Sequence, residues 1–448
     1  MAVIEKQSMP KAEENALNTR MAELLNYDQA LNCMRCGFCL PACPTYREMG
    51  QEASSPRGRI ALMKAAADGL LQNPQVLEDQ LNQCLGCRAC ETACPAGVHY
   101  GELYEQGKQA VEEKHARHRF WVRILRKLAF EHIFPYQKRM RILGGLIAFY
   151  QKSGLQRLVR KLGLIKLFPQ HMQEMEAVLP ETKASGVSQE LGEFIPAKGE
   201  KIGTVGMFSG CIMDIMFLET NKNTVKLLSE AGFDVLIPKQ QNCCGALHAH
   251  NGEREKAKAL AKNNIRAFKE ANVDFIASNA GGCGALLQEY NHLLDDEDED
   301  MRREASWFAG RVKDVSELIL DHSSLRDMGS LNERITYQSS CHLQNGMQVK
   351  DQPHFLLQSI KGAEYVPLLE GERCCGSAGI YNLVQPEMAG RILAEKMEHV
   401  RQTKADTLVT ANPGCLLQMK AGIHKAGLSD KMRAVHIVDL LAEAKRIQ

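Results

Sequence analysis

Cysteine is the residue whose number and spacing in this sequence point most directly to chemistry. Two segments near the start of the chain each read C-x-x-C-x-x-C-x-x-x-C-P, and the second repeats the first at a distance of 51 residues. Their members are Cys33, Cys36, Cys39 and Cys43, followed by Cys84, Cys87, Cys90 and Cys94. Three cysteines at intervals of three residues can wrap one cubane from a tight loop, whereas the fourth points away and serves another cluster. The spacing therefore predicts two 4Fe–4S clusters.

The expected ligand sets cross between the two motifs. Cluster 1 takes Cys33, Cys36, Cys39 and Cys94, and cluster 2 takes Cys84, Cys87, Cys90 and Cys43. Zinc is the main alternative, but tetrahedral zinc sites use pairs of C-x-x-C without a third equally spaced cysteine and a trailing C-P. Buried, unreactive cysteines are a further alternative. Two clusters bound side by side pass single electrons, so an electron-transfer module is expected.

A second, longer repeat contains every remaining cysteine. Its members are Cys211, Cys243, Cys244 and Cys283, which recur as Cys341, Cys374, Cys375 and Cys415 with shifts of 130 to 132 residues. The surrounding sequence repeats too, since DFIASNAGGC from Asp274 matches DTLVTANPGC from Asp406. All sixteen cysteines thus belong to one repeat or the other, which argues against cysteines that merely fill a core.

Each half of this second repeat contains a Cys-Cys-Gly (CCG) triplet. Glycine permits a sharp backbone turn, so both adjacent sulfurs could face one site. Four thiols per half suffice for one further cluster or metal site in each half, or for a site shared between them. A redox thiol pair and a purely structural or docking role stay open. His248, His250 and His342 lie nearby, but a lone histidine is more often an ordinary polar residue than a ligand.

The elements that would position these cysteines can be inferred from residue 200 onward. Strand patterns at 202–208, 233–238 and 274–278 alternate with helical patterns at 220–231 and 253–271, and Cys283 opens another helix. The same order begins again at Arg334. Alternating strands and helices predict parallel β-α-β units. The cysteines then follow the carboxyl ends of strands, where ligand sites of open α/β sheets gather.

The whole chain is predicted to be a multi-domain protein. A mostly α-helical, bacterial-ferredoxin-like domain with two cluster motifs is followed by a helical connector and by two repeated α/β modules with parallel strands. The expected boundaries are 1–30 for an N-terminal helical extension, 31–112 for the ferredoxin-type domain, 113–195 for the connector, and 196–322 and 323–448 for the two CCG modules.

The connector is strongly basic. Between His115 and His171 there are thirteen Lys or Arg residues and one acid, Glu131. Apolar and basic residues alternate there at helical spacing, as in WVRILRKLAFEHIF and LQRLVRKLGLIKLF. Such helices can lie on an anionic membrane surface, dock an acidic partner subunit, or pack their apolar side on a core.

Composition and absent motifs narrow the function further. The net charge of +1 gives no reason to expect a nucleic-acid partner. The N-terminal residues show no secretory signal, so a cytoplasmic chain with reduced thiols is expected. The longest apolar run, Ile142 to Tyr150, is too short to span a bilayer. No G-x-G-x-x-G motif and no catalytic residue is found, so hydride chemistry would need a flavin on a partner subunit.

Several stretches resemble the iron–sulfur subunit of bacterial glycolate oxidase. They are CMRCGFCLPACPTY from Cys33, SPRGRIALMK from Ser55, CLGCRACETACPAGVHYGEL from Cys84, and both CCG modules. The resemblance implies a complex in which two FAD-binding subunits oxidise glycolate to glyoxylate, or another short 2-hydroxy acid such as D-lactate. The iron–sulfur subunit takes their electrons and passes them toward a quinone or another acceptor at the cytoplasmic face of the membrane.

Other functions share parts of this pattern. The iron–sulfur subunit of anaerobic glycerol-3-phosphate dehydrogenase has the same order of modules. A thiol–disulfide reductase similar to the CCG-containing chain of heterodisulfide reductase would use the CCG sites catalytically, and a membrane-anchoring scaffold would hold structural clusters. That reductase chain carries a further cysteine after the last one of each module, whereas here Cys283 is followed by Gly-Ala-Leu and Cys415 by Leu-Leu-Gln. This departure argues against a noncubane cluster that cleaves a substrate.

Overall fold

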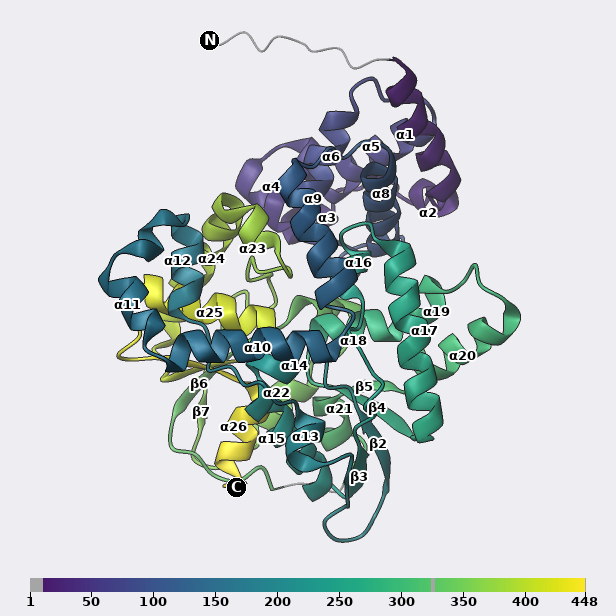
Figure 1. Cartoon of the computed structure of the whole chain (residues 1–448). Helices are drawn as coiled ribbons and strands as arrows, with labels where there is room; N and C mark the ends of the chain where they lie inside the picture. The colour runs from purple at the N-terminus through teal and green to yellow at the C-terminus, as the bar shows by residue number, and fades with distance from the viewer. Residues whose placement is uncertain (1–10, 324–326, 448) are drawn as a thin grey trace. The chain divides into compact units, whose positions relative to one another are not determined.

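The computed structural model describes residues 11–323 and 327–447, with side chains from residue 16 onward (Figure 1). The chain forms two compact units. The first contains residues up to 123 together with 247–254, and the second contains 124–246 and the residues from 255 onward.

The first unit is helical, and its cysteine motifs lie in short turns between longer helices. Its elements are α1 (Lys11–Leu24), α2 (Tyr27–Leu31), α3 (Cys39–Ala42), α4 (Pro44–Met49), the 3-10 turn η1 (Glu52–Ser54), α5 (Pro56–Ala67), α6 (Pro74–Gln83), α7 (Ala89–Thr92) and α8 (Tyr100–Lys114). Helix α1 contacts α5 and α8. Its Leu17 and Met21 are fully buried in the same core as Leu81 and Leu103, so this helix is an integral part of the unit.

The sequence SPRGRI fixes the start of α5. The Ser55 side chain accepts a hydrogen bond from the Gly58 amide at 3.0 Å, and Pro56 occupies the first helical turn. A Cβ atom on Gly58 would lie 2.0 Å from the Glu52 carbonyl oxygen, so no side chain fits there. The tight start directs Arg59 into the interior of the unit, where it is 1% exposed.

A helical linker joins the motifs to the α/β part of the chain, as the sequence predicts. Its elements are α9 (Phe120–Lys127), the π-helical turn η2 (Leu128–Ile133), α10 (Gln137–Lys152), α11 (Leu155–Lys161), the 3-10 turn η3 (Leu164–Leu167), α12 (Gln170–Ala177) and α13 (Val187–Leu191). Helix α10 contacts α11 and also α14 of the first CCG module. The linker is therefore anchored on that module.

The first CCG module follows the linker. Its elements are β1 (Phe194–Ile195), β2 (Gly203–Met207), α14 (Ile212–Met216), α15 (Leu218–Glu230), β3 (Phe233–Leu236), α16 (Ala246–Ala249), α17 (Arg254–Ala271), β4 (Phe275–Ser278), α18 (Gly281–Gln288), α19 (Tyr290–Leu293), α20 (Glu299–Ala309), β5 (Val312–Asp314) and α21 (Val315–Leu320). A Cβ atom on Gly206 would lie 2.7 Å from the ring of Phe268, so α17 packs directly on β2.

The second module repeats this order of strands and helices but has no helix that corresponds to α20. Its elements are β6 (Arg334–Gln338), the π-helical turn η4 (His342–Gly346), α22 (Gln352–Gln358), β7 (Glu364–Tyr365), α23 (Tyr381–Val384), α24 (Pro386–Thr403), β8 (Thr407–Thr410), α25 (Pro413–Lys425), β9 (Arg433–His436) and α26 (Ile437–Ala444).

The two sheets have the same topology. Their strand orders are β1-β3-β2-β4-β5 and β7-β6-β8-β9. All pairings are parallel except that of β1 with β3, which is antiparallel. The predicted parallel α/β repeat is thus confirmed, with β1 as an added edge strand. In each sheet the chain leaves the first strand to one side and returns on the other, so β2 and β4, and likewise β6 and β8, flank a topological switch point.

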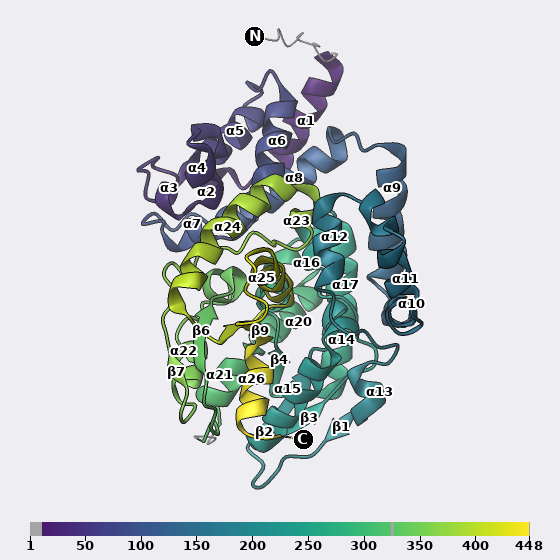
Figure 2. The same ribbon diagram turned by 90° about the vertical axis from the view of Figure 1, so that its left-hand side faces the viewer.

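A helical layer lies between the two sheets of the second unit (Figures 1 and 2). Helices α15 and α21 of the first module contact each other and pack against α26 and α22 of the second. The Asp439 carboxylate accepts hydrogen bonds across this layer from Thr220 at 2.7 Å and from Asn223 at 3.0 Å. Within residues 11–323 and 327–447, no helix has the length and apolar character needed to cross a bilayer.

Candidate metal-cluster sites

The two ferredoxin-type loops share one backbone conformation. Arg35 and Gly37 in the first loop have φ of 56° and 94°, and Gly86 and Arg88 at the corresponding positions of the second have φ of 61° and 60°. Left-handed residues alternating with ordinary ones turn successive amide N–H groups toward one side, which produces a concave site for anionic groups. Both loops are therefore shaped to surround a cluster of thiolates.

Sulfurs from both motifs meet at one site in the first unit. A small cavity there is lined by Cys43 of the first motif and by Cys84, Cys87 and Cys90 of the second. Cys43, Cys87 and Cys90 are buried, and Cys84 is half-buried. These four residues are the ones that the crossed arrangement assigns to cluster 2.

A buried cation lies beside these sulfurs. Arg59 donates from Nε to the Gln80 carbonyl at 2.7 Å and from Nη2 to the Thr45 hydroxyl at 2.9 Å. Its Nη1 lies 3.9 Å from Cys43 Sγ. Burial opposes the charge, but neighbouring groups, above all Cys84, outweigh burial and raise the pKa of Arg59 above its ordinary value. The site thus holds a permanent positive charge.

Neutral donors complete the surroundings of Cys84. Its Sγ accepts a hydrogen bond from the Tyr100 hydroxyl at 3.5 Å and from the Gly86 amide at 3.4 Å. Burial raises the pKa of Tyr100, so its hydroxyl keeps the proton that it donates. Donors of this kind stabilise the negative charge of an iron–sulfur cluster.

The remaining motif cysteines lie nearer the surface. Cys33, Cys39 and Cys94 are half-buried against the core, while Cys36 is exposed. The neighbouring side chains of Met34 and Phe38 are 68% and 65% exposed. The site expected for cluster 1 is therefore the outer of the two, and apolar side chains surround it.

In the first CCG module, four thiols converge from three loops that follow β2, β3 and β4. Cys211 Sγ donates to Cys243 Sγ at 3.6 Å. Cys244 interacts with both Cys243 and Cys283 through hydrogen bonds. The thiols thus form a continuous chain beside the switch point of the sheet.

The second module reproduces this arrangement. Cys341 is hydrogen-bonded to Cys374, and Cys375 to both Cys374 and Cys415. The expectation that each half gathers its cysteines beyond the carboxyl ends of parallel strands agrees with both modules.

The glycine of each triplet is required by the backbone. Gly245 and Gly376 have φ of 90° and 88°, and a Cβ atom on Gly376 would lie 2.9 Å from the Ala389 carbonyl oxygen. The turn brings the Gly245 amide within 3.5 Å of Cys243 Sγ. Adjacent sulfurs can therefore face one site only because the third residue has no side chain.

The donors gathered in both CCG modules are thiols. All sixteen cysteines are free thiols. The hydrogen bond to Cys243, together with burial, raises the pKa of Cys211, so a bound metal would have to displace its proton. No three His, Cys, Asp or Glu side chains converge as ligands of a single metal ion within the described part of the chain. Cysteine sulfurs are the donors that iron–sulfur clusters use, and each module supplies four of them from three loops.

The two CCG sites differ in one buried neighbour. In the first module, Asn264 donates to the Cys243 carbonyl oxygen at 3.0 Å. The corresponding residue of α24 is Lys396, which is 4% exposed and whose amino group donates to the Glu370 carbonyl oxygen at 2.5 Å. Burial lowers the pKa of Lys396 to about 8, although the nearby Cys375 opposes this shift. The second site thus has a cation where the first has an amide.

Several of these groups were not predicted from the sequence. Arg59 lies in the PRGRI stretch that marks the helix start, but nothing local indicates its burial. Lys396 occupies a position that the repeat alone assigns to a polar helix residue. Of the three histidines near the CCG cysteines, His342 places Nδ1 3.5 Å from Cys341 Sγ. His250 belongs to the first unit, where it pairs with Glu105 at 2.9 Å.

Family models match most of the described architecture. A 4Fe–4S dicluster domain covers residues 29–98, the linker region of the glycolate oxidase iron–sulfur subunit covers 121–179, and the cysteine-rich CCG domain matches twice, at 205–288 and 335–420. The chain therefore contains a dicluster domain, a linker specific to one protein family, and two cysteine-rich domains.

Curated relatives align with this chain, two of them over nearly its full length. A probable glycolate oxidase iron–sulfur subunit of Bacillus subtilis is 50% identical over 96% of this chain and 98% of its own. The glycolate oxidase iron–sulfur subunit of Escherichia coli is 30% identical with the same two coverages. Lactate utilization protein A of Oceanobacillus iheyensis is 35% identical over 53% of this chain and 96% of its own. The chain belongs to the family of glycolate oxidase iron–sulfur subunits.

Proposed function

We propose that this chain is the electron-transfer subunit of a flavin-dependent complex that oxidises glycolate to glyoxylate. The observation that carries this proposal is the meeting of Cys43 with Cys84, Cys87 and Cys90 at one buried site, next to a fixed cation. The full-length similarity to glycolate oxidase iron–sulfur subunits supports the substrate class. Neither the glycerol-3-phosphate dehydrogenase subunit nor a heterodisulfide reductase is favoured by these relatives.

Two 4Fe–4S clusters are bound by the crossed ligand sets. Cluster 2 takes Cys43, Cys84, Cys87 and Cys90, and cluster 1 takes Cys33, Cys36, Cys39 and Cys94. The convergence of the first set and the shared loop conformation of the two motifs support this assignment. Single-electron transfer is the chemistry that these groups supply when bound. The chain's own part is to exclude water from the inner set and to hold Arg59 and Tyr100 against its sulfurs.

The CCG modules hold further clusters, one in each module. The ligands would be Cys211, Cys243, Cys244 and Cys283 in the first and Cys341, Cys374, Cys375 and Cys415 in the second. The convergence of each set and the glycine turn that exposes adjacent sulfurs to one site support this assignment.

Electrons enter from partner subunits that carry FAD. Substrate oxidation by hydride removal requires a flavin or nicotinamide, and the partners are two FAD-binding dehydrogenase subunits. The exposed Cys36, with Met34 and Phe38 beside it, is the surface of the first unit best suited to receive them, because an exposed apolar patch next to a redox site favours docking. The electrons then pass toward a quinone or another acceptor.

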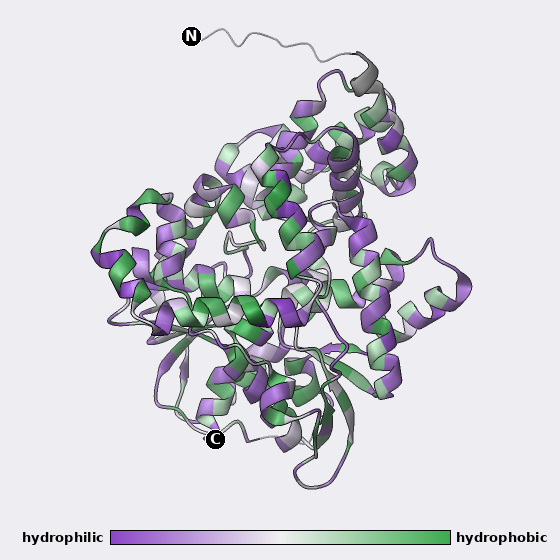
Figure 3. Ribbon diagram, viewed as in Figure 1, coloured by the Kyte–Doolittle hydropathy of each residue, from purple (hydrophilic) through white to green (hydrophobic). Residues whose placement is uncertain are grey.

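The linker attaches the complex to the membrane surface. Exposed apolar residues of α10 and α11 form what we call the linker apolar face, consisting of Ile142, Leu146, Phe149, Leu155, Leu158 and Leu162. On α10 they recur at intervals of four and three residues, which places them on one side of the helix. Exposed basic residues, including Lys152, Arg157 and Lys161, lie among them, and Figure 3 shows both classes along these helices. This combination favours an anionic membrane interface.

The decisive experiment is anaerobic purification of the full chain, followed by iron and sulfide analysis, EPR, and reduction by glycolate with the FAD subunits present. We expect about eight iron atoms per chain from the two motifs and more if the CCG sites are loaded. Glycolate should reduce the clusters only when the FAD subunits are present. Colourless, iron-free protein, or zinc at the motif cysteines, would overturn the proposal.

Vesicle binding tests the membrane attachment separately. The chain should sediment with phosphatidylcholine vesicles that contain phosphatidylglycerol and far less with pure phosphatidylcholine, and added salt should weaken binding. Serine at Ile142, Leu146 and Phe149 should abolish it. The matched control places serine at Leu369 and Val384, which are similarly exposed but lie in the second CCG module. This control variant should still bind the vesicles. Equal loss of vesicle binding in both variants would contradict the assignment of the linker apolar face as the membrane-binding surface.

A further inference from the structure

The repeat reveals a site that is filled in the first CCG module and open in the second. The residues that precede the first cysteine of each module correspond, as do the short helical segments that follow it. Ser209 and Asp214 of the first module thus match Ser339 and Gln344 of the second, each with a shift of 130 residues. The surroundings of these matched pairs differ.

In the first module the linker covers this position. Gln137 of α10 donates to the Ser209 hydroxyl at 3.3 Å, and Arg141 pairs with Asp214 at 3.0 Å. A Cβ atom on Gly144 would lie 3.2 Å from Ile215, so α10 packs closely on α14. Helix α10 of the linker therefore lies against this end of β2.

In the second module the corresponding residues line a cavity of about 470 Å³. It lies at the carboxyl ends of β6 and β7, where open parallel sheets bind ligands. Its wall continues to Gly371 and Glu372, three and two residues before Cys374, and Ser339 precedes Cys341 by two residues. The cavity is therefore adjacent to two of the loops that carry the CCG cysteines.

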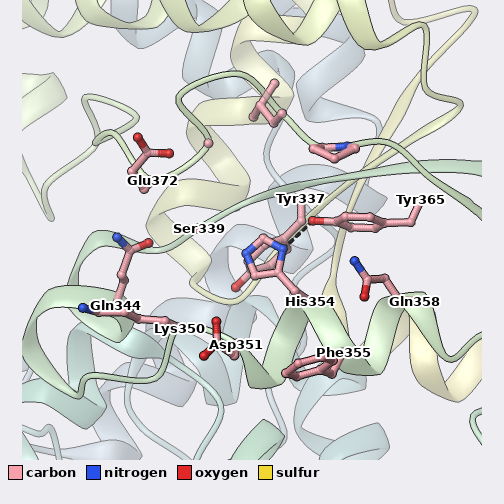
Figure 4. Close-up of a pocket in the computed structure, with 13 residues that line it drawn as sticks. Tyr337, Ser339, Gln344, Lys350, Asp351, His354, Phe355, Gln358, Tyr365 and Glu372 are labelled. Atoms are coloured by element: carbon pink, nitrogen blue, oxygen red, sulfur yellow. Dashed lines mark hydrogen bonds between the residues drawn. The ribbon is translucent and has the colours of Figure 1, made fainter.

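The base of this cavity is aromatic and offers hydrogen bonds (Figure 4). The Tyr337 ring lies edge-on to His354, with ring centroids 5.0 Å apart. His354 Nδ1 is 2.5 Å from the Tyr365 hydroxyl. The Tyr337 hydroxyl is buried, with the residue 2% exposed, and it has no hydrogen-bond partner among the described residues. An orphaned hydroxyl at the base of a cavity is a donor without an acceptor.

The rim determines which ligand class fits. Phe355 is 54% exposed and presents a free aromatic face. The charged lining residues are Lys350, Asp351 and Glu372. Burial lowers the pKa of His354, which is therefore neutral at neutral pH. With two carboxylates against one cation, the cavity does not favour an anion. A flat, neutral, largely apolar ring that carries carbonyl acceptors matches both the aromatic wall and the unpaired donor.

We propose that this cavity binds the head group of a quinone, which accepts the electrons that the chain carries. This proposal rests on the proposed electron-transfer function. The quinone gains two electrons, delivered singly from the oxidised substrate, and two protons from solvent, and two O–H bonds form to give the hydroquinone. The Tyr337 hydroxyl donates to one carbonyl oxygen. The His354–Tyr365 pair leads from the base of the cavity to the rim and supplies a proton path.

Binding of menadione to the anaerobically purified full chain tests the proposal. Phe355→Ala should weaken binding about tenfold through the lost aromatic contact, and Tyr337→Phe about fivefold through one lost hydrogen bond. Phe194→Ala is the matched control, because Phe194 is also 54% exposed but lies on the edge strand β1. It should leave binding unchanged. Absent binding, or equal affinity in all four proteins, would overturn the proposal.

A second measurement separates this inference from the electron-transfer function. Dithionite-reduced chain is reoxidised either by menadione or by ferricyanide, a polar oxidant that does not need the cavity. The variants Phe355→Ala and Tyr337→Phe should slow reoxidation by menadione several-fold and leave reoxidation by ferricyanide unchanged. If ferricyanide reoxidises the chain but menadione reoxidises every variant at the same rate, only the proposed quinone site is refuted. If dithionite reduces no cluster at all, the proposed electron-transfer function itself is refuted.

Discussion

Removing the buried charge of Arg59 should lower the reduction potential of cluster 2. The guanidinium is 1% exposed, lies 3.9 Å from Cys43 Sγ, and is held by the Thr45 hydroxyl and the Gln80 carbonyl. A fixed cation stabilises the reduced cluster, which carries one more negative charge, over the oxidised one. Arg59→Gln removes the charge with a side chain of related shape, so reduction should become harder.

The expected shift of the reduction potential follows from Coulomb's law. The added electron is spread over the cluster, so its mean separation from the guanidinium exceeds the distance to the nearest sulfur and is about 7 Å, by allowance for the size of a cubane. At an effective dielectric constant of about 20, the interaction is about 2.4 kcal/mol. For a one-electron couple this corresponds to about 100 mV.

The assay is an EPR-monitored redox titration of the anaerobically purified chain. Lys64→Gln is the matched control, because it removes the same charge from the same helix at a half-buried side chain that pairs with Asp68 near the surface. Solvent screening should keep the shift of the control below about 20 mV. Arg59→Lys should retain most of the wild-type potential, which distinguishes loss of charge from loss of shape. A shift of Arg59→Gln no larger than that of Lys64→Gln, or a shift upward, would refute the electrostatic reasoning.

Three further changes test other parts of the structure. Cys36→Ser should lower the iron content by about four atoms per chain and leave the EPR signal of cluster 2 in place; loss of both clusters would contradict the assignment of Cys36 to cluster 1 alone. Gly376→Ala should cost about 2 kcal/mol in a denaturant titration, because φ is 88° and the new Cβ would lie 2.9 Å from the Ala389 carbonyl. Burial raises the pKa of Asp314 to about 7. Since the folded state then holds this proton more tightly than the unfolded state, stability should fall as pH rises from about 4 to 7, by at most about 4 kcal/mol. Asp314→Asn should reduce that pH dependence.

The repeats made the architecture predictable. Two copies of the same strand and helix pattern determined the parallel α/β modules, and the spacing of 51 residues identified the dicluster domain. Three of the short strands, β1, β5 and β9, were missed. β5 has three residues and β9 has four, with sequences VKD and RAVH, and neither is long enough for a periodic pattern to distinguish a strand from a loop. Their place in the sheet depends on β4 and β8, which are distant in sequence.

The gathering of the cysteines was predicted from the sequence, but the groups that surround them were not. An arginine in a helix is ordinarily a surface residue, and Arg59 is buried only because a carbonyl of α6 and a hydroxyl and a sulfur at the start of α4 receive its donors. Lys396 is similar, since its partner is the carbonyl of Glu370 in a loop before the cysteine pair. Such partners are set by tertiary packing, which local patterns do not encode.

A comparison of the two CCG modules separates the features that the fold requires from those that are specific to one site. Strand order, the glycine turn and the chain of four thiols are the same in both, so these features are what the fold needs in order to gather the sulfurs. The differences lie around the site. Asn264 corresponds to Lys396, and the position that α10 covers beside Asp214 is open beside Gln344. A cation beside a cluster raises its potential and an adjacent cavity admits a small molecule. On the proposal that each module holds a cluster, these two differences favour the second module both as the more readily reduced site and as the site with access to an acceptor.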